Sequence, residues 1–124
     1  MISGLYAALL GLIFLGLTHY VIAGRKQHQI ALGDGGNDDL ATRIRIHGNF
    51  AETVPLTLVL MILAEMQGVP LLALHAMGLM LITGRVAHIA GLRRPSLRWR
   101  IVGMVLTQVV IFSCCVFLLY KYID

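Results

Sequence analysis

The chain has 124 residues, of which 58% are apolar and only 13% are charged. This composition excludes a disordered protein and an ordinary soluble domain, and the length is too short for two domains. The formal net charge of +4 would point to nucleic acid in a soluble protein, but in a membrane protein it reflects basic cytoplasmic loops. We therefore expect one all-α membrane domain with no nucleic-acid partner.

Four apolar stretches are each long enough for a transmembrane helix, which needs about 20 residues. The first lacks a basic start and a convincing cleavage site, so we expect a retained helix and not a signal peptide. The predicted helices cover residues 2–24, 39–67, 71–92 and 101–120. The sequence thus predicts a four-helix bundle over residues 1–124.

Three connections join these helices. The first is rich in Gly and Asp, and Asp38 or Asp39 is expected to cap the second helix. The third is a basic loop over residues 93–100. Eight basic residues lie at or beside the first and third connections: Arg25, Lys26, Arg43, Arg45, Arg93, Arg94, Arg98 and Arg100. Because the opposite end carries only Lys121, the positive-inside rule predicts that both termini lie on the non-cytoplasmic side.

A polar stripe enters the membrane on the second predicted helix. Arg45, Asn49 and Glu52 follow one another at spacings of four and three residues, so their side chains share one face. A lone charge near the bilayer centre costs at least ~2.5 kcal/mol. Glu52 and Arg85 must therefore face partners or water, and each is expected to be the counter-charge of the other.

These residues predict a mainly cationic pocket that opens toward the cytoplasm. Guanidinium groups bind carboxylates through two hydrogen bonds, and Glu52 can accept an ammonium group, so a small zwitterionic peptide with two carboxylates fits. The alternative is structural, because polar side chains also hold membrane helices together. We favour a site because a whole stripe and Arg85 occur together. His88, one turn after Arg85, either lines this pocket or bonds a backbone carbonyl.

Other polar residues receive simpler interpretations. We expect His47 at a subunit or headgroup contact, and Glu65 near the far interface, where its side chain can reach the headgroups. His19 and His75 have no acid or cysteine at a ligand spacing, so we expect no metal site.

The segment over residues 43–55 resembles the Arg-x-His-x-Asn-x-x-Glu signature of the MAPEG family, membrane-associated proteins in eicosanoid and glutathione metabolism. In this chain the signature residues are Arg45, His47, Asn49 and Glu52, with Pro55 close behind. Arg85 and His88 resemble the second mark of the family, on its third helix. The resemblance covers nearly the whole chain. In length and loop style the chain is most similar to the small bacterial members of the family.

The resemblance implies a homotrimer in the bacterial inner membrane, with glutathione as cosubstrate at subunit interfaces near the cytoplasmic face. The residues implied as glutathione contacts are Arg45, Asn49, Glu52, Arg85 and His88, with Arg25 or Lys26 as an addition from the end of the first helix. In enzymes of the family an Arg near the start of the fourth helix stabilises the glutathione thiolate. Arg98 and Arg100 are both candidates for that catalytic role, and Leu92 stands where several members carry Tyr.

Three functions are compatible with the residues. The first is a glutathione-dependent transferase or peroxidase that acts on lipophilic electrophiles from the bilayer. The second is a non-catalytic protein of the same scaffold that binds lipid or presents a partner, which the missing Tyr favours. The third is a small exporter of cationic drugs, which is disfavoured because arginines accompany Glu52.

Overall fold

The computed structural model describes all 124 residues and contains four helices and no strand. The helices are α1 (Ile2–His28), α2 (Asp38–Met66), α3 (Leu71–Arg93) and α4 (Leu97–Ile123). Each is long and apolar enough to cross a membrane. The predicted four-helix architecture is thus confirmed.

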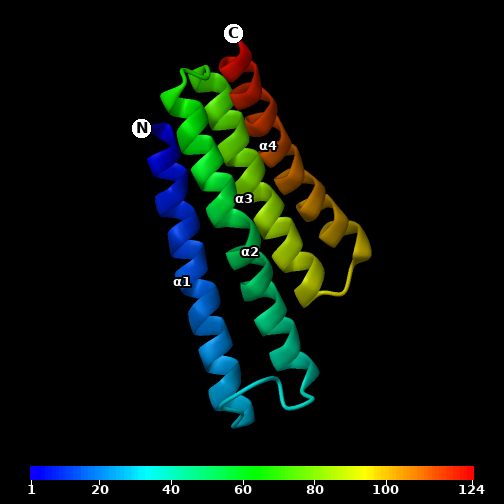
Figure 1. Cartoon of the computed structure of the whole chain (residues 1–124). Helices are drawn as coiled ribbons and strands as arrows, with labels where there is room; N and C mark the ends of the chain where they lie inside the picture. Colours follow the sequence, from blue (N-terminus) through cyan, green and yellow to red (C-terminus); the bar gives the residue numbers. More distant parts are fainter.

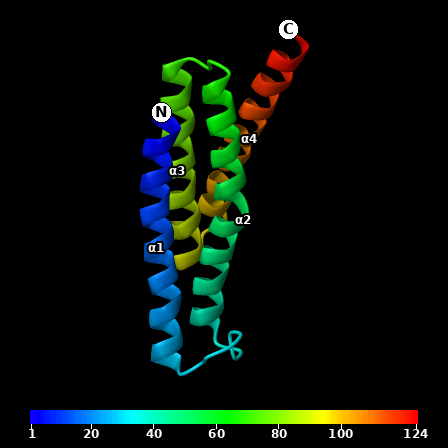
Figure 2. The ribbon, with the colours of Figure 1, turned by 60° about the vertical axis from the view of Figure 1, so that its left-hand side comes forward.

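The four helices run alternately up and down, so both termini and the α2–α3 turn lie at one end (Figure 1). At the other end, α1 and α2 extend beyond the α3–α4 turn in both views (Figures 1 and 2). The helix α4 packs along α3 and against α2 but makes no contact with α1. Its C-terminal end leans away from the other helices (Figure 2).

The helix bounds differ from the predicted ones mainly at the ends where charged residues flank the apolar segments. The helix α1 continues four residues past the predicted end to His28, and α4 begins at Leu97, four residues earlier than predicted. The hydroxyl of Ser96 accepts from the backbone N–H of Trp99 at 3.5 Å and caps α4. Charged residues mark where a helix leaves hydrocarbon, but they do not stop backbone hydrogen bonding. Arg98 and Arg100 therefore belong to the first turn of α4.

The first loop is held by its own polar groups. The guanidinium of Arg25 donates to the carbonyls of Ile30 and Gly33 at 3.4 and 2.8 Å. The N-cap of α2 is Asn37, whose side chain accepts from the Leu40 N–H at 2.9 Å. The predicted caps Asp38 and Asp39 lie inside the helix instead, where their negative charges favour the positive end of the helix dipole.

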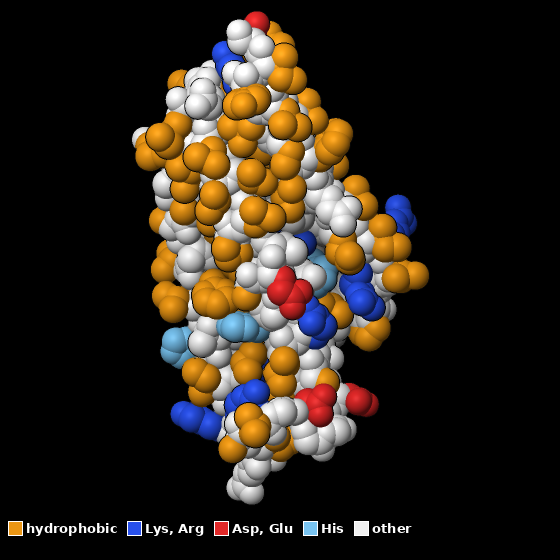
Figure 3. Space-filling view, viewed as in Figure 1, with side chains coloured by type: hydrophobic (Ala, Val, Ile, Leu, Met, Phe, Trp, Pro, Cys, Tyr) orange, Lys and Arg blue, Asp and Glu red, His pale blue; other side chains and the backbone are white.

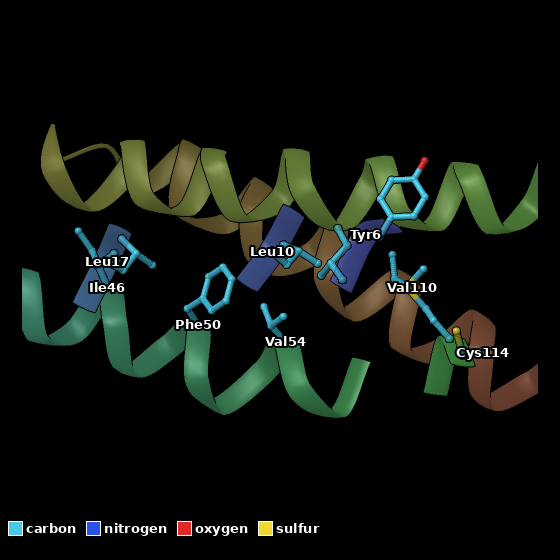
Figure 4. Packing of buried hydrophobic residues seen from close by; sticks show 10 residues of the cluster. Tyr6, Leu10, Leu17, Ile46, Phe50, Val54, Val110 and Cys114 are labelled. Atoms are coloured by element: carbon cyan, nitrogen blue, oxygen red, sulfur yellow. The ribbon is translucent and has the colours of Figure 1, made fainter. Parts of the chain in front are cut away.

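Apolar side chains from α1 and α2 interlock along the core, and α3 and α4 add to it. Figure 4 shows Leu10 and Leu17 of α1 facing Ile46, Phe50 and Val54 of α2. In lipid such packing holds helices together by van der Waals contact, because lipid tails are as apolar as Leu. Large apolar side chains cover most of the outer surface, as expected for a surface in contact with lipid (Figure 3).

Glu65 has a structural role that differs from the predicted one. Its carboxylate accepts hydrogen bonds from the backbone N–H groups of Ile2 and Ser3 at 2.6 and 2.9 Å. The side chain therefore caps the first turn of α1, which has no side-chain cap of its own. The expected reach toward headgroups is replaced by a contact between α2 and α1.

Candidate functional site

Arg85 lies at the point where α2, α3 and α4 meet. Its side chain is buried, with the residue only 2% exposed. The guanidinium donates to the Asn49 side-chain oxygen at 2.5 Å and the Thr53 hydroxyl at 3.3 Å on α2, and to the Gly103 carbonyl at 3.2 Å on α4. One residue thus links three helices.

Close backbone contact between α3 and α4 makes this arrangement possible. A Cβ atom at Gly103 would lie 2.5 Å from the Gly84 carbonyl oxygen and 2.6 Å from the backbone nitrogen of His88. Only glycine permits this approach, which brings the Gly103 carbonyl within reach of α3. The same carbonyl accepts from the Thr107 hydroxyl at 3.0 Å.

Every hydrogen-bond partner of Arg85 is neutral. No carboxylate lies within ion-pair distance of its guanidinium, and its Nε–H has no partner. A buried cation without an anion is costly, and an unpaired buried donor adds to that cost. The centre of the site therefore carries uncompensated positive charge.

Glu52 is not the counter-charge of Arg85, contrary to the prediction. Its carboxylate accepts from the Arg45 guanidinium at 2.9 Å, between two residues seven apart on α2. The side chains of Arg45 and Glu52 are 52% and 63% exposed. The predicted stripe therefore splits, because Asn49 turns inward to Arg85 while Arg45 and Glu52 form a pair on the outer surface.

His88 is buried one turn beyond Arg85, at the contact with Gly103. Its ring makes no hydrogen bond to a backbone carbonyl, which was one of the two expected roles. Arg85 lies one turn before His88 on the same helix, and Arg100 packs against Gly91, one turn after it. Figure 3 shows basic, acidic and His side chains side by side midway down the face in view.

The remaining predicted residues lie in different places. Arg100 is exposed in the first turn of α4, with its backbone nitrogen against Gly91, where an added Cβ would lie at 2.6 Å. Arg98 is also exposed. Arg25 is committed to carbonyls of the first loop and makes no contact with the other predicted residues.

Sequence reasoning missed Thr53 and Gly103 as partners of Arg85. Thr53 follows Asn49 by four residues, so helical spacing could have placed it on the same face. Gly103 contributes only a backbone carbonyl, which leaves no side-chain signal. His47 was expected at a subunit or headgroup contact, but its ring packs on Phe14 of α1 with centroids 4.7 Å apart, and it bonds the Thr18 hydroxyl at 3.1 Å.

The arrangement suits a small anion. The positive charges of Arg45, Arg85 and Arg100 outnumber the single carboxylate of Glu52. The buried guanidinium of Arg85 has no negative partner. No group of three or more His, Cys, Asp or Glu side chains could hold a metal ion. The chemistry on offer is charge-assisted hydrogen bonding to carboxylates, with one carboxylate available for an ammonium group.

Comparison with known proteins places this chain among membrane proteins. Residues 3–120 match the model of the MAPEG family. The chain is 40% identical over 104 residues to inner membrane protein YecN of Escherichia coli K12, covering 84% of this chain and 79% of the relative. The YecN protein of a second strain, O6:H1, matches with the same identity and coverage. No solved structure shows a significant match.

Proposed function

The chain belongs to the MAPEG family, and on that premise we propose that it binds glutathione and uses it as a cosubstrate against lipophilic electrophiles. The observation that carries this proposal is the buried Arg85 guanidinium, which has only neutral partners, beside the exposed pair of Arg45 and Glu52. Glutathione supplies what this site lacks, namely two carboxylates for the guanidinium groups and an ammonium group for Glu52.

The site is completed between subunits of a homotrimer. Exposed side chains continue the stripe of Arg45 and Glu52 along α2 at alternating spacings of four and three, which is the pattern of a helix-packing seam. These are Leu56, Val59, Leu63 and Met66, each between 44% and 71% exposed in the single chain. An ion pair facing acyl chains is costly, so burial of this seam against a second copy removes the cost.

Activation of the thiol is assigned to Arg100. A cation close to the glutathione sulfur lowers the thiol pKa and raises the fraction of thiolate, which is the nucleophile. The thiol proton passes to water, and the thiolate forms a bond to the electrophilic carbon while a leaving group such as halide departs with the electron pair of its own bond to that carbon. Of the two candidates, Arg100 is preferred to Arg98 because its backbone packs against Gly91 of α3, one turn after His88.

The test is titration of the purified protein with glutathione while the ultraviolet absorbance of the thiolate is recorded. We expect saturable binding with thiolate formation, loss of binding in Arg45→Ala, and retained binding with reduced thiolate in Arg100→Ala. Arg98→Ala is the matched comparison for Arg100. Lys121→Gln, at the opposite end of the bundle, is the control that keeps both signals. A wild-type protein that does not bind glutathione refutes the proposal.

A non-catalytic lipid-binding protein is the second candidate. It is favoured by an apolar groove between α1 and α2, lined by Ala7, Gly11, Ala51 and Pro55 among others. Leu92 in place of the Tyr found in several family members also favours it. Copurified lipid without any glutathione conjugation distinguishes this function from the first.

The location proposed for this protein is the bacterial inner membrane, with both termini on the non-cytoplasmic side. The name of the YecN relatives supports the compartment, and the basic residues at the two loops of one end support the orientation. Reporter fusions at the C-terminus test the orientation, and a cytoplasmic reporter signal contradicts it.

A further inference from the structure

The α3–α4 turn carries a cluster of arginines, of which the proposed glutathione site uses only Arg100. Arg93 and Arg94 end α3, and Arg98 and Arg100 follow in the first turn of α4. None of the four forms an ion pair or donates a side-chain hydrogen bond within the chain. No acidic residue lies in the first turn of α4, so the positive end of its dipole adds to their charge.

The basic residues near the first loop, at the same end of the bundle, differ. Arg43 donates to Asp39 at 3.0 Å and to the Tyr20 carbonyl at 2.9 Å, and Arg25 is bound by loop carbonyls. Basic residues that only set the orientation of the chain in the membrane do not need a cavity beside them. The arginines of the α3–α4 turn are instead exposed around hollows in the surface.

Two adjoining hollows lie at this turn and share Ala90, Arg93 and Arg94. One, of about 710 Å³, is also lined by Pro95, Ser96 and Trp99. The other, of about 520 Å³, extends along α3 past Val86 and Ile89. The two guanidinium groups therefore lie where the hollows meet, and apolar side chains extend from them along α3.

We propose that these two hollows form a binding site for an anionic phospholipid of the cytoplasmic leaflet. Arg93, Arg94 and the Ser96 hydroxyl hold the phosphate of the headgroup, and an acyl chain follows the groove along Val86 and Ile89. The flanking side chains favour a lipid over a soluble anion. Val86, Leu97 and Trp99 are 53%, 69% and 55% exposed, and Trp concentrates at the membrane interface.

Arg93 and Arg94 differ in how their side chains are held. The Arg93 guanidinium lies 5.4 Å from the centre of the Tyr20 ring of α1, so its position is set by a cation–π contact. Arg94 is the C-cap residue of α3 and has extended backbone geometry, and its side chain forms no ion pair. We therefore expect Arg94 to be the residue that can be changed with the least effect on the bundle.

The experiment uses Trp99, the only Trp of the chain, as the probe. The full-length protein is placed in phosphatidylcholine nanodiscs that contain either brominated phosphatidylglycerol or brominated phosphatidylcholine at equal mole fractions. We expect phosphatidylglycerol to quench Trp99 fluorescence at a lower mole fraction. Arg94→Gln should lower this preference about fivefold, as expected for one basic group near an anionic surface, and Arg93→Gln with Arg94→Gln should abolish it.

The matched control is Lys26→Gln, which removes one charge from the first-loop end and should leave the preference unchanged. Equal quenching by the two lipids in the wild-type protein overturns the proposal, as does a preference that survives in the double variant. If inorganic phosphate removes the preference while chloride at equal ionic strength does not, the site takes a free anion and the lipid assignment is wrong. Glutathione binding by Arg94→Gln should be normal, so this proposal and the proposed function fail separately.

Discussion

Arg85 and Arg45 lie near one another on adjacent helices, yet their surroundings are opposite. Arg85 is buried and bonded to α2 and α4 of the same chain, through neutral oxygen atoms. Arg45 is half exposed and holds only Glu52 on its own helix. The first guanidinium joins helices of one chain, whereas the second is available to a ligand or to another chain. Two arginines of one predicted pocket thus have separable roles.

The two acidic residues of α2 within the membrane span show the same contrast. Glu65 bonds two backbone N–H groups of α1 and so joins two helices of one subunit. Glu52 bonds only Arg45 and leaves most of its side chain exposed. Substitutions at Arg85 should therefore change the stability of the subunit, and substitutions at Arg45 and Glu52 should change binding.

The largest effect is expected for Arg85→Met. This change removes the bonds to Asn49, Thr53 and Gly103 and leaves the Asn49 side-chain oxygen without that donor, and these losses outweigh the relief of a buried charge that has no anion. We expect the free energy of unfolding in detergent to fall by about 2 to 4 kcal/mol. The free energy of unfolding of Arg85→Lys should lie between those of the wild-type protein and Arg85→Met, because one ammonium group cannot reach both helices as the forked guanidinium does. A Met variant as stable as the wild-type protein contradicts the assigned role.

A smaller loss is expected for Gly103→Ala, which tests the close approach that brings α4 to Arg85. The added methyl group meets backbone atoms of Gly84 and His88 at 2.5 and 2.6 Å, so the two helices must separate. We expect destabilisation by about 1 to 3 kcal/mol. Gly16→Ala is the matched control, because a Cβ there has nothing within 4 Å. Equal unfolding curves for the two variants would show that the α3–α4 crossing tolerates the methyl group.

The smallest change in stability is expected at the exposed pair. Arg45→Ala and Glu52→Gln should each alter the free energy of unfolding of the single chain by less than about 1 kcal/mol, since the pair joins two residues of one helix and holds no second helix in place. Calorimetric titration should nevertheless show that both variants bind glutathione at least tenfold more weakly. If unfolding of either variant matches that of Arg85→Met, the division between the two arginines is wrong.

Much of the fold was predictable from residue patterns. The helix count, the order of the turns and the helical face shared by Arg45, Asn49 and Glu52 follow from hydropathy and from the 3.6-residue period. The pairing of Glu52 with Arg85 was predicted wrongly. Charge and depth alone favoured it, but Arg45 on the same helix reaches Glu52 first, while Asn49 and Thr53 occupy the guanidinium of Arg85.

The amino-acid sequence by itself determined that this chain forms four apolar helices with basic connections at one end, because hydrocarbon tolerates only segments whose backbone bonds are satisfied internally. Tertiary structure decided which polar groups meet. The partners of Arg85 include a backbone carbonyl on α4, and the cap of α1 comes from a residue more than 60 positions away. Such contacts depend on how closely two helices approach and how they are rotated, and neither quantity can be read from the spacing of residues along one helix.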